Sequence, residues 1–98
     1  MKKEYSIMPI DLNYSIKRTA YYCERHEVFF GQAYRKKSIE DGLIVFLTPQ
    51  LHRGNYGVHG KYGKDFNLYL KQIGQRVWQK YYNKTTEDFI KRYGKNYL

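Results

Sequence analysis

The sequence contains little cysteine, which forms disulfides, little proline, which interrupts helices and strands, and no long apolar run that could anchor it in a membrane. One cysteine and two prolines occur among 98 residues, and a single cysteine excludes an internal disulfide. No apolar run approaches the roughly 20 residues of a membrane-spanning helix, and no stretch has the charged and then apolar pattern of a signal peptide. We therefore expect an intracellular protein with one domain, residues 1–98, because chains usually divide only at greater lengths.

Acidic residues are also scarce. Nine Asp and Glu stand against eighteen Lys and Arg, which leaves a formal net charge of +9. Such a surplus favours binding to a polyanion such as nucleic acid, although charge alone also fits a basic protein with no nucleic-acid role. Aromatic residues, in contrast, are abundant, with twelve Tyr and five Phe. They can build a small core or stack on bases.

The first third of the sequence predicts an extended arm and then a strand. Residues 1–20 show no sustained hydrophobic period and are interrupted by Pro9, which favours an arm with at most one edge strand. Residues 19–30 are rich in aromatic and β-branched side chains, as in a strand with one functional face. Residues 33–41 predict a short helix or ordered loop that Gly42 ends.

An unbroken apolar run, residues 43–47, is typical of a strand buried on both faces. We expect it to pair antiparallel with residues 25–29. Glycine then recurs at every third position from 54 to 63, without the spacing of a phosphate-binding fingerprint. Because glycines let the backbone turn tightly or approach a ligand closely, the sequence predicts an irregular loop between His52 and the next helix.

Two helices are predicted at the C-terminal end. Apolar residues recur at three- and four-residue spacing over residues 65–82, as in an amphipathic helix that buries Leu70 and turns Gln75 to water. A second helix should begin at residues 85–88, which fit a capping-box variant, and end at Gly94. Strands followed by helices in this order indicate an α+β fold class.

All three histidines fall between residues 21 and 63. His26 lies on the first predicted strand, and His52 and His59 lie seven residues apart in the predicted loop. Three neutral imidazoles can hold one divalent metal ion and leave a coordination position open. Such a metal can stabilise the charge that develops on a phosphodiester. Glu27, beside His26, is the candidate base that activates the attacking water.

Other interpretations of these residues stay open. Adjacent residues in a regular strand point to opposite faces, so a bulge or a strand end must bring both His26 and Glu27 to one site. Each histidine taken alone is also common as a hydrogen-bonded core, surface or turn residue. Cys23 lies three residues before His26, but without a second cysteine we expect a free buried thiol rather than a ligand or nucleophile.

Several short blocks between residues 22 and 98 carry a family resemblance. They are HEVFFG at 26–31, RKKS at 35–38, GLIVFL at 42–47, His52, GVH at 57–59 and FIKRYGKNYL at 89–98. These blocks resemble small phage-encoded HNH nucleases of the His-Me finger group, which includes RecA-dependent nuclease-like proteins. The resemblance implies a ββα-metal hairpin at 21–63, an N-terminal arm at 1–20 and two C-terminal helices at 64–98. It also implies a phage protein in the cytoplasm of a bacterial host.

The resemblance assigns roles to the histidines and departs from the family at three points. It implies that His26, His52 and His59 hold one divalent metal ion, which is Mg, Mn, Zn or Ni. His26 and Glu27 stand at the family's catalytic pair, whose second member is commonly histidine, and a carboxylate is a weaker base unless burial raises its pKa. Residues 48–52 replace a Cys-x-x-Cys-His block, and the middle Asn has no evident counterpart. An inactive descendant is therefore an open alternative.

Two functions follow from these patterns. The first is a metal-dependent endonuclease that hydrolyses phosphodiester bonds in DNA. The second is a catalytically degenerate HNH-like phage protein that binds nucleic acid, or inhibits or modulates a host defence or recombination protein. A protein partner and a homodimer are compatible with the small size, and no membrane partner is expected. The candidate nucleic-acid contacts are Arg35, Lys36, Lys37, Arg53, Lys61 and Lys64.

Overall fold

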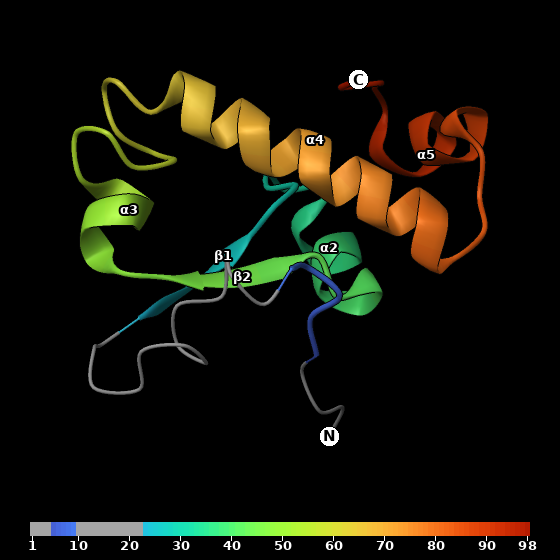
Figure 1. Cartoon of the computed structure of the whole chain (residues 1–98), viewed down its shortest axis with the longest axis horizontal. Helices are drawn as coiled ribbons and strands as arrows, with labels where there is room; N and C mark the ends of the chain where they lie inside the picture. The colour runs from blue at the N-terminus through green and yellow to red at the C-terminus, as the bar shows by residue number, and fades with distance from the viewer. Residues whose placement is uncertain (1–4, 10–22) are drawn as a thin grey trace.

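The computed structural model describes residues 5–9 and 23–98 of the chain. Its strands are β1, Glu24–Glu27, and β2, Ile44–Leu47, and its helices are α2, Arg35–Asp41, α3, Pro49–Arg53, α4, Lys64–Tyr81, and α5, Thr86–Tyr93. Helix α2 lies between the strands in the sequence, and α3 to α5 follow β2 (Figure 1). The described part of the chain is therefore a small α+β protein, as the sequence predicts.

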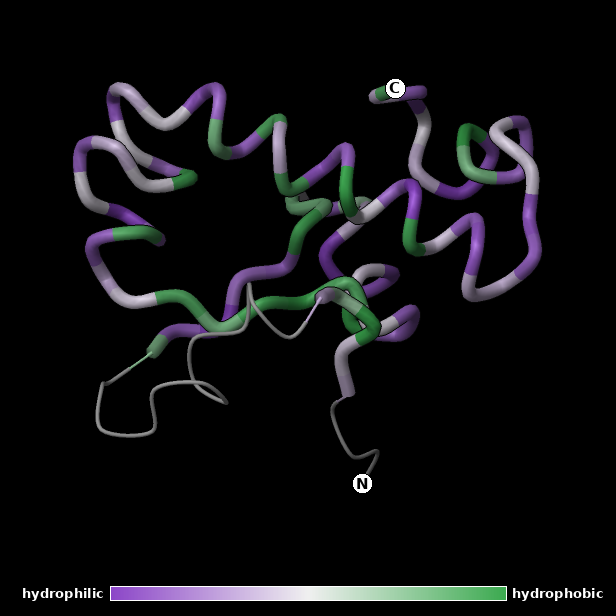
Figure 2. The backbone as a smooth tube through the Cα atoms, viewed as in Figure 1, coloured by the Kyte–Doolittle hydropathy of each residue, from purple (hydrophilic) through white to green (hydrophobic). Residues whose placement is uncertain are grey.

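The two strands form one antiparallel sheet, which confirms the predicted pairing. The register sets His26 opposite Val45 and Glu27 opposite Ile44. Strand β2 is apolar throughout, and it is visible as a continuous hydrophobic stretch in Figure 2. The strand predicted over residues 19–30 ends in the structure at Glu27, and its first four positions lie outside the described residues.

Helix α2 is fastened to the segment that follows β1. Gly42 ends the helix with φ 76°, a left-handed conformation that glycine adopts without strain, and its N–H donates to the Ile39 carbonyl at 3.3 Å. The buried hydroxyl of Ser38 donates to the Phe29 carbonyl at 2.7 Å and accepts from the Phe29 N–H at 3.1 Å. Residues just past β1 are thereby held against α2.

The hydrophobic core lies between the sheet and the two C-terminal helices. In Figure 1, α4 runs across the sheet, and α5 lies near the C-terminal half of α4. The most deeply buried apolar residues of the core cluster are Val28, Phe29, Leu43, Val45, Leu47, Leu70, Trp78, Phe89 and Tyr93. The Phe29 ring packs against Phe89 and Tyr93 with centroids 5.2 and 4.7 Å apart, so aromatic contacts join the segment after β1 to α5.

Helix α4 confirms the predicted amphipathic helix, with Leu70 buried. The expectation that Gln75 faces water is wrong, because this side chain is fully buried. Its amide donates to Asn96 Oδ1 at 2.8 Å, and its carbonyl oxygen accepts from the Tyr97 N–H at 2.8 Å. The segment after α5 thus returns to α4 and supplies polar partners that pattern alone does not reveal.

Helix α5 begins and ends as predicted. The Thr85 hydroxyl accepts from the Asp88 N–H at 3.1 Å, and the Asp88 carboxylate accepts from the Thr85 N–H at 3.0 Å, which is a capping box. Gly94 ends the helix with φ 82°. None of the helices within the described residues combines the length and the apolar character needed to cross a membrane.

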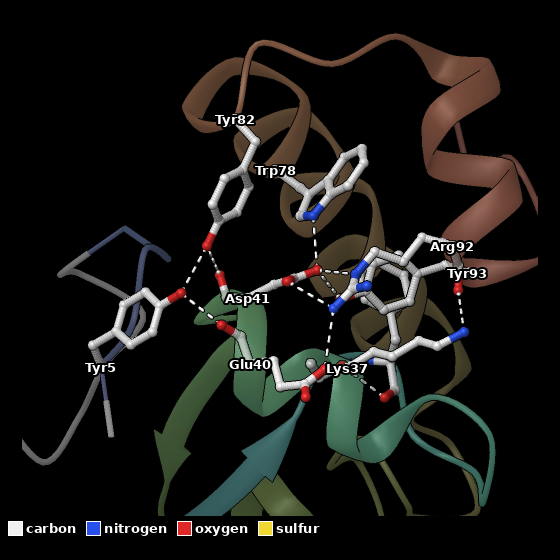
Figure 3. Close-up of polar contacts among 10 residues, drawn as sticks. Tyr5, Lys37, Glu40, Asp41, Trp78, Tyr82, Arg92 and Tyr93 are labelled. Carbon is white, nitrogen blue, oxygen red and sulfur yellow. Dashed lines mark hydrogen bonds and ion pairs between the residues drawn. The ribbon is translucent and has the colours of Figure 1, made fainter. Parts of the chain in front are cut away.

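Asp41, the last residue of α2, connects that helix to both C-terminal helices (Figure 3). Its carboxylate accepts from Trp78 Nε1 at 2.8 Å, from Arg92 Nε at 2.5 Å and from Tyr93 Oη at 2.7 Å. Tyr82 Oη donates to the Asp41 carbonyl at 2.9 Å. Burial, followed by the Asp41 charge, raises the pKa of Tyr93. One carboxylate therefore satisfies donors from two helices.

The N-terminal arm is described only over residues 5–9, which contain no strand. The Ile7 N–H donates to the Gly42 carbonyl at 2.8 Å, and the Tyr5 hydroxyl donates to the Glu40 carbonyl at 2.6 Å. These bonds place this segment against the end of α2, as expected for an arm packed on the domain. The remaining positions of the predicted arm lie outside the described residues.

Replacing Asp41 with Asn should lower the free energy of unfolding by about 3 kcal/mol, because it removes the charge that pairs with Arg92 and turns an amide toward buried donors. Glu40→Gln is the matched control. Its ion pair with Arg92 is longer, at 3.3 Å, and more exposed, so a change below about 1 kcal/mol is expected. Urea unfolding followed by circular dichroism measures both, and equal losses would contradict the central role of Asp41.

Candidate metal centre

The buried imidazole of His26 is the centre of the candidate site. It lies in the middle of β1 and is 1% exposed. Its Nε2 atom is buried and has no hydrogen-bond partner within the described part of the chain. An imidazole nitrogen buried without a partner costs free energy that a bound ligand can recover. This atom is therefore a candidate metal ligand.

His52 and His59 bring two more imidazoles to His26. Their ring centroids lie 5.3 and 5.2 Å from that of His26 and 4.9 Å from each other. One ligand nitrogen of each ring lies within 4.8 Å of the other two. Nitrogens bound at roughly 2.1 Å to a tetrahedral metal lie about 3.4 Å apart, a separation within this limit. The three histidines lie close enough to hold a metal ion, as the sequence predicts.

His52 is positioned by a helix rather than by the predicted loop. It lies in α3, where Thr48 is the N-cap and Pro49 occupies the first turn. A Thr-Pro pair is a good helix start, because the threonine side chain accepts from a free N–H and proline already has a helical φ. That signal was present in the sequence, but the glycines that follow it favoured a loop. His52 is therefore held by the backbone of helix α3.

The loop from Gly54 to Gly63 carries His59 and packs its backbone against itself. The His59 N–H donates to the His52 carbonyl at 3.0 Å. A Cβ atom at Gly60 would lie 1.8 Å from the Gly54 oxygen, and one at Gly63 would lie 1.5 Å from the Gly57 oxygen. Only glycine permits such backbone contacts. The predicted close approach is therefore backbone to backbone, and it fixes His59 beside His52.

Glu24 orients His52, a role that the sequence analysis missed. Its Oε1 accepts from His52 Nδ1 at 2.8 Å, and Arg53 Nη2 donates to Oε2 at 2.7 Å. The Arg53 bond, followed by the His52 bond, lowers the pKa of Glu24 to about 2. A charged carboxylate fixes the proton on Nδ1 and leaves Nε2 available to a metal. The available signal was strand alternation, which puts Glu24 and His26 on one face.

Burial and neighbouring charges keep His26 and His59 in the neutral form that binds metals. Burial, followed by the charges of His59 and His52, lowers the pKa of His26 to about 3. Burial is also the main cause of the lowered pKa of His59. Neutral imidazole, rather than imidazolium, is the ligand form. At neutral pH both rings can therefore accept a metal without first losing a proton.

Glu27, the candidate base, is engaged by arginines. Arg25 Nε lies 2.9 Å from its Oε2, and Arg35 Nε lies 3.4 Å from its Oε1. It alternates with His26 along β1 and is not one of the three grouped ligands. Its charge partly offsets the lowering of the His59 pKa. Glu27 is therefore a sequence neighbour of the candidate metal ligands rather than one of them.

The six basic residues predicted to contact nucleic acid occupy different positions. Arg35 and Arg53 lie next to the cluster through their ion pairs with the two glutamates of β1. Lys37 is turned away, since its Nζ donates to the Arg92 carbonyl at 3.1 Å (Figure 3). The other three residues are exposed and make no such hydrogen bond or ion pair within the described residues. They are Lys36 on α2, Lys61 in the glycine loop and Lys64 at the start of α4.

The free energy of unfolding of the metal-free protein should fall by about 2 kcal/mol between pH 7 and pH 5. Unfolded His26 gains a proton below about pH 6.5, whereas folded His26 gains one only near a pKa of about 3. Stability is therefore lost as pH falls through this window. Urea unfolding in EDTA measures it, and His26→Leu should show a shallower pH dependence. An unchanged slope in that variant would contradict the assignment.

Glu24→Gln should weaken metal binding by roughly 10-fold or more, because a carboxylate behind a ligating histidine holds its orientation and raises its basicity. Titration calorimetry with Zn²⁺ or Ni²⁺ measures the affinity. Glu87→Gln, a carboxylate change on α5, is the control and should leave the affinity unchanged. A Glu24→Gln protein that binds metal as tightly as the parent would exclude this role for Glu24.

Comparison with known proteins found no family model, no curated protein and no solved structure that matches this chain.

Proposed function

We propose that the protein is a metal-dependent endonuclease that hydrolyses phosphodiester bonds in DNA. The observation that carries the proposal is the unpaired, buried Nε2 of His26 next to two further imidazoles. The formal charge of +9 supports a polyanionic substrate. One histidine on β1 and one on α3, with β2 between them in the sequence, support a ββα-metal core of the HNH type and the phage origin that this resemblance implies.

The donor set favours particular metals. Imidazole nitrogens suit Zn²⁺ and Ni²⁺, whereas Mg²⁺ and Mn²⁺ prefer oxygen ligands. We therefore place Zn²⁺ or Ni²⁺ first among the four candidate metals. Held by three histidines, such a metal would retain a position for water or a phosphate oxygen, where it supplies a lowered water pKa and charge stabilisation.

The side chains around the histidines suit a phosphodiester. Arg35 and Arg53 present guanidinium groups beside the cluster, and guanidinium matches the geometry of a phosphate. A phosphate that draws Arg35 away from Glu27 would free the Oε1 atom of that carboxylate to approach the attacking water. Glu27 then serves as the base toward the attacking water. The substrate itself would complete the catalytic arrangement.

A second candidate function is a degenerate HNH-like protein that binds nucleic acid, or a host defence or recombination protein, without cleavage. The observation that favours it is the pairing of Glu27 with two arginines. The two ion pairs engage both oxygens of the carboxylate, so neither is free to accept a proton from water. In this interpretation the metal cluster stabilises the fold, and the basic surface makes the contacts.

The deciding experiment is cleavage of plasmid and single-stranded DNA with Zn²⁺, Ni²⁺, Mn²⁺ or Mg²⁺ and with EDTA. His26→Ala and His59→Ala should lose both metal binding and cleavage, and the exposed His59 should do so with little effect on folding. Glu27→Gln should keep metal affinity and lose about 100-fold or more in rate, as expected for a lost base. Glu87→Gln is the control.

One outcome would contradict the nuclease, and another would contradict only the role of Glu27. No cleavage by a folded, metal-loaded protein with any of these metals would favour the binding function instead. Full activity of the Glu27→Gln protein would remove Glu27 from the mechanism. DNA affinity should also fall steeply as the salt concentration rises, because phosphates release counterions when the protein binds them. A binding affinity that does not change with salt concentration would indicate a protein partner.

A further inference from the structure

Two tyrosines of the glycine loop stack on each other at the surface. Tyr56 is 73% exposed and Tyr62 is 55% exposed. Their ring centroids lie 5.2 Å apart at an interplanar angle of 30°. Single apolar residues are common on protein surfaces and need no functional explanation. Two large rings that contact each other in solvent are a different case. The two rings cover one face of each other, and the more exposed ring, that of Tyr56, can stack with a further planar group on its outer face.

The backbone fixes this pair before any ligand arrives. The Tyr62 N–H donates to the Asn55 carbonyl at 2.6 Å, which sets Tyr62 beside the residue that precedes Tyr56. Gly60 has no room for a side chain, since its Cβ would lie 2.6 Å from the same Asn55 oxygen. Val58, between the tyrosines in sequence, is buried in the core and anchors the loop. A prearranged surface loses less entropy when it binds.

The charge around the tyrosine pair is entirely of one sign along the loop. Lys61 Nζ lies 5.4 Å from the centroid of the Tyr62 ring. Between Arg53 and Lys64 the sequence contains no Asp or Glu. Aromatic faces with an adjacent cation are the combination that binds single-stranded nucleic acid, in which rings stack on bases and lysines meet the backbone. A basic partner would find no complementary charge here, and an acidic partner without planar groups would leave the tyrosine faces unused.

We propose that Tyr56 and Tyr62 form a stacking platform for an unpaired base of single-stranded nucleic acid, with Lys61 on the neighbouring phosphate. A base inside a duplex already stacks on both sides, so a surface ring can take only a base with a free face. The platform deepens the proposed function and rests on it for the choice of nucleic acid as ligand. It specifies the substrate class as single strands, or junctions and ends with unpaired bases.

The platform and the candidate metal centre belong to one loop. His59 lies three residues after Tyr56 and three before Tyr62. Its ring is in the histidine cluster, while the tyrosine rings face solvent. A base stacked on the tyrosines would therefore anchor its strand on the element that carries a metal ligand. The loop would therefore bind the single strand close to the candidate metal centre.

The test is fluorescence anisotropy with a labelled single-stranded oligonucleotide and with the matching duplex, in EDTA so that nothing is cleaved. Tyr56→Ala and Tyr62→Ala should each weaken single-strand binding by about 5-fold or more, and duplex binding by less than twofold. Tyr56→Phe and Tyr62→Phe should bind like the parent, because a phenyl ring also stacks. Tyr81→Ala, at the end of α4 and 62% exposed, is the matched control.

The proposal is overturned if both alanine variants, with unchanged circular dichroism and thermal unfolding, bind single strands within twofold of the parent. Equal losses on single strand and duplex would also overturn it, because they would indicate a general contact. Metal-dependent cleavage with undiminished single-strand affinity in these variants would reject the platform and leave the nuclease standing. Tyrosine-dependent binding without cleavage by any metal would reject the nuclease and support the platform.

Discussion

The charge of Asp41 is the constraint on which the arrangement of the helices depends. It ends α2 and accepts from donors on α4 and α5, and α2 in turn holds the residues after β1 through Ser38. The position of β1, and with it His26, therefore depends on the polar contacts made at the C-terminal end of α2. A chain of this size has little apolar area to fix its elements by packing alone, so a multiply bonded carboxylate carries that role.

Much of this fold follows from local signals. The apolar run of β2 is bounded by glycine and proline, and the reciprocal bonds of Thr85 and Asp88 depend only on residues three apart. The grouping of the histidines was also predictable, because His52 and His59 lie close in sequence and an antiparallel partner strand brings His26 nearby. Signals of this kind act over a few residues, and tertiary contacts only reinforce them.

The remaining features depend on contacts between distant segments. Glu24 meets His52 across 28 positions, and Gln75 meets Tyr97 across 22. Neither pair leaves a periodic trace, since any polar side chain on those faces gives the same pattern. A lone glutamate in a strand and a lone glutamine on a helix therefore look like solvent-facing residues until the docking of α3 and of the C-terminal segment is known.

The self-packed glycine loop has a consequence for how this protein can diverge. Each glycine lies against the backbone of an earlier turn, so a side chain or a one-residue insertion at any of them displaces everything after it. His59 and the two stacked tyrosines share that loop, so their geometry is inherited or lost as one unit. In descendants of this chain, the four glycines should be retained while the histidine cluster and the tyrosine pair are both under selection. They should be replaced together once either feature is lost.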